Sequence, residues 1–209
     1  MYQNHIKRAI DICVALFGLL LLSPFLLVVV ILVRIQMGSP VLFKQQRPGL
    51  HGKPFDILKF RTMTNAKDDN GQLLPDVQRV TWFGNLLRKT SIDEFPELIN
   101  VLKGDMSLVG PRPLLMRYFP YYTDKEMRRH DVRPGITGLA QINGRNLLNW
   151  DERLRMDVEY VEHHNLMLDL WIIFKTLGKV LGQKDVVIAD HNPLQDLDME
   201  RNNKRSENQ

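Results

Sequence analysis

The stretch Ile12-Cys-Val-Ala-Leu-Phe-Gly-Leu-Leu-Leu-Leu-Ser-Pro-Phe-Leu-Leu-Val-Val-Val-Ile-Leu-Val33 decides which kind of fold this chain can have. It carries no charge, and its length matches the roughly 20 apolar residues that a helix needs to cross a bilayer. Ser23 and Pro24 lie at its centre, where proline removes an amide donor and clashes with the preceding turn. Each half is then too short to cross a hydrocarbon layer about 30 Å thick. The residues alone leave a spanning helix and a re-entrant helix-break-helix as alternatives.

Positive charges flank the apolar run on both sides. Two precede it and three follow it, namely Lys7, Arg8, Arg34, Lys44 and Arg47. This symmetry gives none of the usual orientation signal, and it suits a helical hairpin that enters and leaves on the same, cytoplasmic face. A cleaved signal peptide is not indicated, because the apolar run is too long and a poor cleavage site follows it. Prolines also occur in spanning helices, so both alternatives stay open.

Composition excludes several classes of protein. The 209 residues suffice for one domain with a core, and the net charge of +4 suits an anionic membrane surface or phosphorylated substrates. No nucleic-acid motif is present, so we expect no nucleic-acid partner. Cys13 is the single cysteine, which rules out a disulfide framework and a multi-cysteine metal site. The sequence also lacks the glycine-rich loops of the Walker and Rossmann types.

The hydrophobic patterns predict an α+β fold that is mostly helical. Residues 40–46 and 54–61 alternate as two strands around the turn 47–52, which predicts a short β-hairpin. Helices are expected over four segments, 82–89, 92–103, 150–163 and 166–181. The segment 133–145 reads as a loop with a short strand. The apolar faces of 82–89 and 166–181 suit either a protein core or a membrane interface.

The strongest chemical signal is Arg88-Lys-Thr-Ser-Ile-Asp-Glu-Phe-Pro-Glu-Leu98. It places Asp93 and Glu94 in the first turn of an expected helix, where the helix dipole favours anions and free N–H groups bind phosphate. Two adjacent carboxylates are suitable ligands for Mg²⁺ shared with substrate phosphates, and a carboxylate can attack phosphorus. Ser91 and Glu94 also match a capping box, which alone would explain both residues without an active site.

Basic residues that can bind phosphate recur around this pair. Lys59 and Arg61 end the second expected strand two residues apart, so both point to one face. Further candidates are Arg88, Arg112 and Arg145. Each alone is typical of a solvated surface, but together they supply the bidentate donors that a diphosphate needs. Asp157 and Tyr160, at i and i+3 of a helix, are expected to support the site from behind.

Five motifs occur in a fixed order along the chain. They are Ser23-Pro24, Lys59-Phe-Arg-Thr-Met63, Ser91-Ile-Asp-Glu-Phe-Pro-Glu-Leu98, Gly104-Asp-Met-Ser-Leu-Val-Gly-Pro-Arg-Pro113 and Arg133-Pro-Gly-Ile-Thr-Gly138. In this order they resemble the bacterial sugar transferases, which are monotopic polyprenol-phosphate phosphoglycosyl transferases. The resemblance extends from about Tyr2 to Leu181 and is closest to the minimal members of the family, which lack an extra multi-span region. Small departures at Phe95, Glu97 and Leu139 leave the acidic pair unchanged.

The resemblance implies a two-step reaction with Mg²⁺. Asp93 would attack the phosphorus that bears the sugar in a UDP-sugar, release UMP and hold the phosphosugar covalently. A polyprenol phosphate, expected to be undecaprenyl phosphate, would then take the phosphosugar, which is the first membrane step of bacterial glycoconjugate assembly. Glu94 would help to hold the metal. The phosphates would be stabilised by Lys59, Arg88, Arg112 and Arg145.

The resemblance also implies an architecture. It favours a re-entrant membrane helical hairpin over 1–38, broken at Ser23-Pro24, and a catalytic domain over 39–185 with amphipathic helices at the interface. The domain would lie on the cytoplasmic face of the bacterial inner membrane. Gln141 and Asn143 are expected on the nucleotide side of the site. The polar composition of 186–209 predicts a disordered tail.

Three other functions fit parts of the pattern. A glycosyltransferase would use the same donor but release UDP, and a sugar-nucleotide hydrolase would need no lipid acceptor. A membrane scaffold would explain the anchor and the capping box, but it leaves Lys59, Arg88 and Arg112 without a role. The sequence fixes neither the sugar, nor the glycan pathway, nor the oligomeric state, so a homo-oligomer remains an option.

Overall fold

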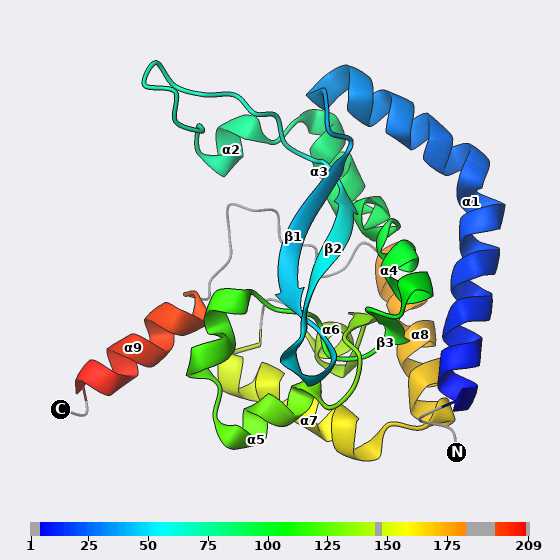
Figure 1. Cartoon of the computed structure of the whole chain (residues 1–209), viewed down its shortest axis with the longest axis vertical. Helices are drawn as coiled ribbons and strands as arrows, with labels where there is room; N and C mark the ends of the chain where they lie inside the picture. Colours follow the sequence, from blue (N-terminus) through cyan, green and yellow to red (C-terminus); the bar gives the residue numbers. More distant parts are fainter. Residues whose placement is uncertain (1–4, 145–147, 183–194, 208–209) are drawn as a thin grey trace.

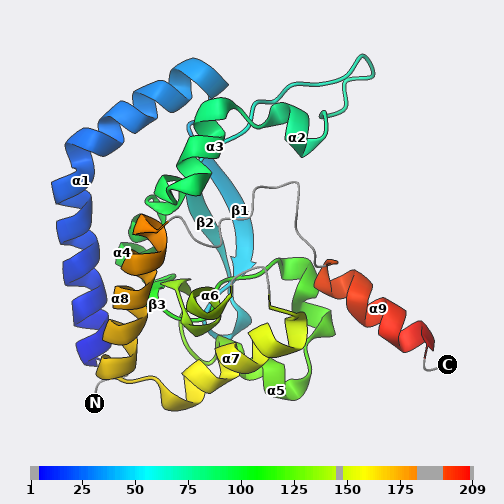
Figure 2. The same cartoon turned by 180° about the vertical axis from the view of Figure 1, so that it is seen from behind.

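The computed structural model describes residues 5–144, 148–182 and 195–207 of the chain. A long helix, α1 (Lys7–Met37), curves along one side of a small α+β body, as Figures 1 and 2 show from opposite sides. A β-hairpin of β1 (Leu42–Pro48) and β2 (Pro54–Phe60) occupies the centre. The mostly helical α+β fold is therefore confirmed. The prediction for Arg145 lies outside the described residues.

Helix α1 is continuous through Ser23 and Pro24, so the predicted break into two helices is not confirmed. Figures 1 and 2 show that the helix instead bends about halfway along its length. Pro24 lacks the N–H of a regular turn, and the Ser23 hydroxyl donates to the Leu20 carbonyl at 2.8 Å. Both features are established causes of helix bending. The re-entrant path through a bilayer stays a prediction.

Both ends of α1 are fixed to the same body. At the start of the helix, the Asp11 carboxylate accepts hydrogen bonds from the Ser107 hydroxyl at 2.8 Å and the Leu108 N–H at 3.1 Å. At its end, Val29, Val33 and Met37 are buried in a cluster around the end of β2 and α3. The bend lets a helix about 46 Å long follow a compact domain.

The outward face of α1 is almost entirely apolar. Large side chains such as Phe17, Leu20 and Ile35 are 67%, 66% and 73% exposed. Among the described residues, α1 is the helix long and apolar enough to cross a bilayer, and only 11% of its most apolar window is buried. A core helix of a soluble protein would be mostly buried, so this surface indicates a membrane protein.

The hairpin confirms the two predicted strands. β1 and β2 pair antiparallel, with Leu42 opposite Phe60 and Pro48 opposite Pro54. In this register β2 ends at Phe60, which places Lys59 at the end of the hairpin. A second sheet pairs β3 (Ser107–Val109) in parallel with β4 (Gly135–Thr137). β4 is the short strand expected within 133–145, whereas β3 was not predicted.

Three predicted helices are confirmed with their bounds, α3 (Trp82–Lys89), α7 (Trp150–His163) and α8 (Leu166–Leu181). α8 is not wholly core-facing, because Ile172 is buried whereas Met167 and Phe174 are 74% and 75% exposed. The remaining short helices are η2 (Leu50–Gly52), α2 (Asp76–Arg79), η4 (Met116–Tyr121), α5 (Asp124–Met127), η5 (Arg128–His130) and α6 (Leu139–Asn143).

The single helix predicted over 92–103 is wrong. The structure has a short 3₁₀ turn, η3 (Ile92–Glu94), followed by α4 (Glu97–Lys103). Ser91 adopts a left-handed conformation with φ 56° and its side chain makes no capping hydrogen bond, so the capping box is wrong too. Pro96 has no N–H to extend the first turn into a regular helix. A capping box therefore does not explain the presence of Ser91 and Glu94.

The predicted disorder of 186–209 is wrong for the stretch that forms α9 (Leu197–Glu207). Leu197 is fully buried in a cluster with Leu114, Tyr118 and Trp150. Arg201 makes ion pairs with two carboxylates of the body, at 2.7 and 2.8 Å. One apolar anchor and a few ion pairs dock a helix whose composition is otherwise polar.

The buried ring of His130 predicts that the stability of the fold depends on pH. Its ring is buried against Phe119 and Tyr122, and Nδ1 lies 3.1 Å from the Met127 carbonyl oxygen. Burial and the neighbouring Arg129 charge lower the pKa of His130 to about 4, whereas a histidine in an unfolded chain has a pKa of about 6.5. The neutral ring therefore stabilises the fold fully above about pH 6.5, and this contribution of about 3 kcal/mol is lost as pH falls towards 4.

The measurement is the free energy of unfolding in detergent between pH 7.5 and about 4 for wild type and His130→Gln. The variant should lose less stability over this range, because glutamine does not titrate. An equal loss in both proteins would contradict the assignment to His130.

Candidate active site

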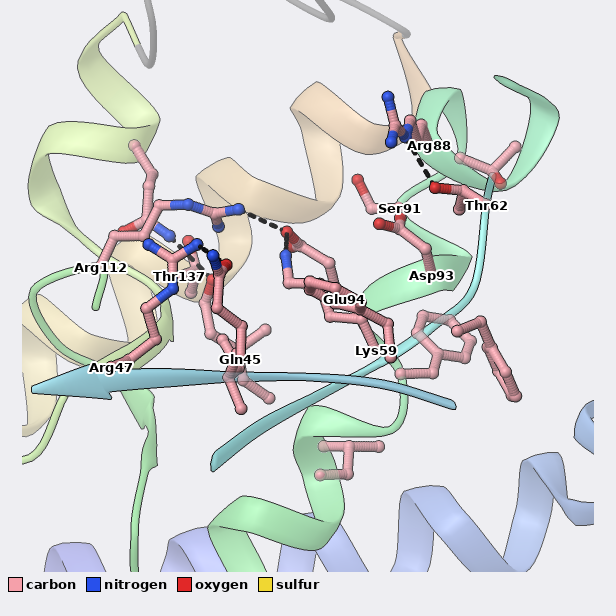
Figure 3. Close-up of a pocket in the computed structure, with 18 of the residues that line it drawn as sticks. Gln45, Arg47, Lys59, Thr62, Arg88, Ser91, Asp93, Glu94, Arg112 and Thr137 are labelled. Atoms are coloured by element: carbon pink, nitrogen blue, oxygen red, sulfur yellow. Dashed lines mark hydrogen bonds and ion pairs between the residues drawn. The ribbon is translucent and has the colours of Figure 1, made fainter. Parts of the chain in front are cut away.

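The predicted acidic pair lies in a cavity of about 1040 Å³. Its walls come from the hairpin, from α3 and η3, from α8, and from the loop that follows β3. Figure 3 shows the polar groups that line it, with Glu94 in the middle. Chain segments far apart in sequence therefore meet around residues 93 and 94.

Glu94 holds two of the predicted phosphate-binding cations. Its Oε1 lies 2.6 Å from Lys59 Nζ and 2.6 Å from Arg112 Nη2. Burial acts to raise the pKa of Glu94, but the charges and hydrogen bonds of Arg112 and Lys59 outweigh it and hold this pKa well below its usual range. Glu94 is therefore ionised at neutral pH and fixes both cations at the centre of the cavity.

Asp93 contrasts with its neighbour. It lines the cavity and, among the described residues, makes no hydrogen bond or ion pair. Burial and the Glu94 charge raise the pKa of Asp93 to about 6 against the opposing effect of Lys59, Arg112 and Arg88. Adjacent carboxylates with separated pKa values commonly have different roles. Glu94 fixes two cations in the cavity, whereas the Asp93 carboxylate has no such partner within the described residues.

Arg88 lies at the Asp93 end of the cavity (Figure 3). Its Nε donates to the Thr62 hydroxyl at 2.9 Å, which orients the guanidinium, and its other nitrogens have no further partner within the described residues. Arg61 also lines the cavity, but its Nε and Nη1 donate to the carbonyls of Met63 and Ser39. These bonds give Arg61 a bracing role at the end of the hairpin.

The two residues predicted for the nucleotide side are placed differently. Gln141 lines the cavity and donates to the Ile136 carbonyl at 2.8 Å, while its Oε1 is buried without a hydrogen-bond partner. Asn143 does not line the cavity and donates to the Leu139 carbonyl within its own helix. Of the pair, only Gln141 lies at the cavity wall.

Comparison with known proteins identifies the family. Residues 2–183 match the family model described as "Bacterial sugar transferase". The chain belongs to the bacterial sugar transferase family. The resemblance stated from the motifs is thereby confirmed, and the chain is an enzyme of the phosphoglycosyl transferase class.

Its relatives align with most of the length of this sugar transferase. It is 54% identical over 186 residues to "Uncharacterized sugar transferase EpsL" of Bacillus subtilis, covering 89% of this chain and 92% of that protein. It is 42% identical to "UDP-glucose:undecaprenyl-phosphate glucose-1-phosphate transferase" of Escherichia coli, covering 83% of this chain but only 40% of that protein. It is 40% identical to "UDP-N-acetylgalactosamine-undecaprenyl-phosphate N-acetylgalactosaminephosphotransferase" of Aeromonas hydrophila, covering 84% of this chain and 44% of that protein.

Three residues that sequence reasoning missed complete the site of the transferase. Glu97 is buried 3.2 Å from Lys59 Nζ, and burial together with the Glu94 charge raises the pKa of Glu97 to about 7. Arg47 comes from the end of β1 and lines the cavity beside Arg112. The third is Arg129, which no local pattern singles out.

Arg129 lies directly behind Arg112. Its Nη2 donates to the Arg112 carbonyl at 2.6 Å and to the Asp157 carboxylate at 2.8 Å, and both side chains of this ion pair are buried. The interpretation of Asp157 as a support behind the site agrees with this geometry. The Tyr160 hydroxyl, by contrast, lies 3.0 Å from the Val109 carbonyl oxygen and 2.7 Å from Asp169 Oδ1, and so joins α7 to β3 and α8.

Proposed function

We propose that this sugar transferase moves a sugar-1-phosphate from a UDP-sugar to a membrane polyprenol phosphate, with Asp93 as the covalent carrier and UMP as the leaving product. One observation carries the proposal. Asp93, which makes no ion pair within the described residues, stands beside a Glu94 whose Oε1 is engaged by two cations, inside a cavity lined by further arginines. This arrangement supplies a nucleophile and a phosphate-binding surface in one place.

In the first step an Asp93 carboxylate oxygen attacks the phosphorus bonded to the sugar. The bond from that phosphorus to the bridging oxygen breaks, and its electron pair leaves with UMP. In the second step a phosphate oxygen of the polyprenol phosphate attacks the same phosphorus, and the Asp93 carboxylate is released. Lys59, Arg88 and Arg112 stabilise the charge that passes through the phosphates in both steps.

The donor set fits Mg²⁺. Both oxygens of Asp93 and Oε2 of Glu94 have no partner within the described residues, whereas Oε1 of Glu94 is occupied by the two cations. The described residues contain no group of three or more metal-binding side chains. A site with two carboxylates suits Mg²⁺, which usually takes one or two protein carboxylates and completes its shell with substrate phosphates and water. When bound, the ion would neutralise phosphate charge.

The membrane arrangement supports a lipid acceptor. The two ends of α1 contact one body, and its exposed face is apolar. We infer a re-entrant helix that enters and leaves the cytoplasmic face of the bacterial inner membrane, with α8 at the interface. α8 supports this because Ile173 and Leu177 line the cavity, while Phe174 and Met167 face outward. A prenyl chain can then stay in the bilayer while its phosphate reaches Asp93.

The named relatives suggest the donor class. One acts on UDP-glucose and another on UDP-N-acetylgalactosamine, so a UDP-hexose is the donor that we propose here. Gln141 is retained as a candidate contact for the nucleotide, and Arg145 as a further phosphate-binding residue. A role for Asn143 would require its side chain to leave its own helix.

The decisive experiment measures nucleotide release by the purified protein in detergent with Mg²⁺ and a panel of UDP-sugars, with and without undecaprenyl phosphate. We expect continued UMP release only when both a suitable donor and the lipid are present. UDP as product would indicate a glycosyltransferase, and sugar phosphate formed without lipid would indicate a hydrolase. Either product would overturn the proposal, and the absence of any nucleotide from all donors would favour a scaffold.

A further inference from the structure

Arg47 is a cavity cation that has no carboxylate partner among the described residues. Its Nη2 donates to Gln45 Oε1 at 2.6 Å and its Nη1 donates to the Pro113 carbonyl at 3.3 Å, and both acceptors are neutral. Its Nε is buried and has no hydrogen-bond partner in the part of the chain that the structure describes. Lys59 and Arg112, in contrast, share the Glu94 carboxylate. A partly buried guanidinium held only by neutral groups leaves positive charge and a donor unsatisfied.

Arg112 adds a second positive charge beside Arg47 (Figure 3). Burial and the Arg112 charge lower the pKa of Arg47 to about 10, which still leaves Arg47 charged at neutral pH. Glu94 supplies one negative charge to this region but also neutralises Lys59. Two neighbouring guanidinium groups with so little compensation favour the binding of a polyanion.

The order of groups along the cavity indicates which anion this is. In Figure 3, Asp93 and Arg88 lie on one side of Glu94, and Arg47 and Arg112 lie on the other. In phosphoryl transfer the attacking and leaving oxygens lie roughly in line on opposite sides of phosphorus. If Asp93 attacks from its side, the leaving phosphate therefore departs towards the side that carries Arg47.

We propose that Arg47, together with Arg112, binds the phosphate of the departing UMP. This inference rests on the proposed function and adds a nucleotide-phosphate subsite to it. The leaving phosphate gains negative charge when its bond to the attacked phosphorus breaks. The Arg47 guanidinium lines the cavity and is held in place by one hydrogen bond from each Nη, to Gln45 and to the Pro113 carbonyl, so that its charge and the second N–H of each Nη are positioned for that phosphate.

The test compares Arg47→Gln with Lys44→Gln, a control that removes one charge from an exposed position of the same strand. Three constants are measured in each variant: the inhibition constant of UMP, the KM for the UDP-sugar and the KM for undecaprenyl phosphate. We expect Arg47→Gln to weaken UMP inhibition about tenfold or more while the KM for undecaprenyl phosphate stays within about twofold. Lys44→Gln should change none of the three.

A rise in the KM for undecaprenyl phosphate with unchanged UMP inhibition would assign Arg47 to the acceptor and overturn the proposal. No change in any constant would overturn it as well. Arg47→Lys keeps the charge and serves if Arg47→Gln does not fold, and it should bind UMP more weakly than wild type because lysine lacks the planar fork. Calorimetric titration of UMP tests the Arg47 subsite separately from the proposed transfer reaction. UMP binding that depends on Arg47 supports the subsite even if UMP is not the reaction product.

Discussion

Replacement of Asp93 by Asn should reduce UMP release and phosphosugar transfer about a thousandfold or more, because the amide keeps the shape of the side chain but is a poor nucleophile. Asp93 makes no hydrogen bond or ion pair within the described part of the chain, so its replacement by the isosteric Asn breaks none. The fold should therefore persist, and the melting temperature should stay at or above that of wild type. Loss of activity with a retained fold separates a chemical role from a structural one.

The covalent step is measured directly with a UDP-sugar labelled in the sugar. Wild-type protein incubated without lipid acceptor should retain label after denaturing separation, and Asp93→Asn should retain none. Asp69→Asn is the matched control, because Asp69 is exposed on the polar loop and does not line the cavity. Transfer at the wild-type rate by Asp93→Asn would exclude this residue as the nucleophile.

Replacement of Arg129 by Met should destabilise the protein by about 3–5 kcal/mol, since it leaves the buried Asp157 carboxylate without its partner. Burial already raises the pKa of Asp157 despite the nearby Arg129 charge. The substitution also removes the donor to the Arg112 carbonyl, and with it a contact that holds the loop carrying Arg112, which we propose to bind phosphate. Activity should fall along with stability, because Arg112 is no longer held in place.

The measurement is the free energy of unfolding in detergent, followed at a single pH near neutrality. The double variant Arg129→Met with Asp157→Leu should recover much of the lost stability, because it removes both buried charges. Arg128→Met is the matched control: Arg128 is an exposed neighbour that pairs with Glu162, and its loss should cost about 1 kcal/mol or less. Equal losses for the Arg128 and Arg129 variants would contradict this account.

Local sequence patterns predicted the helices and strands whose formation depends mainly on their own residues. Alternating side chains identified the β-hairpin, and apolar residues at helical spacing identified α3, α7 and α8 with their bounds. Local patterns failed at Ser91, which matches a capping box but has a left-handed backbone and makes no capping hydrogen bond. They also failed at α9, a helix of polar composition that one buried leucine and long-range ion pairs stabilise. Contacts from distant segments outweigh local preference at α9, and they engage Glu94 with Lys59 and Arg112 instead of a cap.

The sequence by itself determined that the chain has an apolar segment of membrane-helix length with a proline at its centre, an adjacent carboxylate pair and several candidate phosphate-binding cations. Its ordered motifs also determined the family. Only the tertiary structure decided which cations meet the pair. It set Lys59 and Arg112 on Glu94 and gave Asp93 no ion-pair partner among the residues it describes. It also turned Arg61 to backbone carbonyls and brought the unpredicted Arg47 beside Arg112. The physical reason is that charge pairing acts over a few ångströms in space. Separation along the chain, such as the 66 positions between Arg47 and Pro113, carries no information about it.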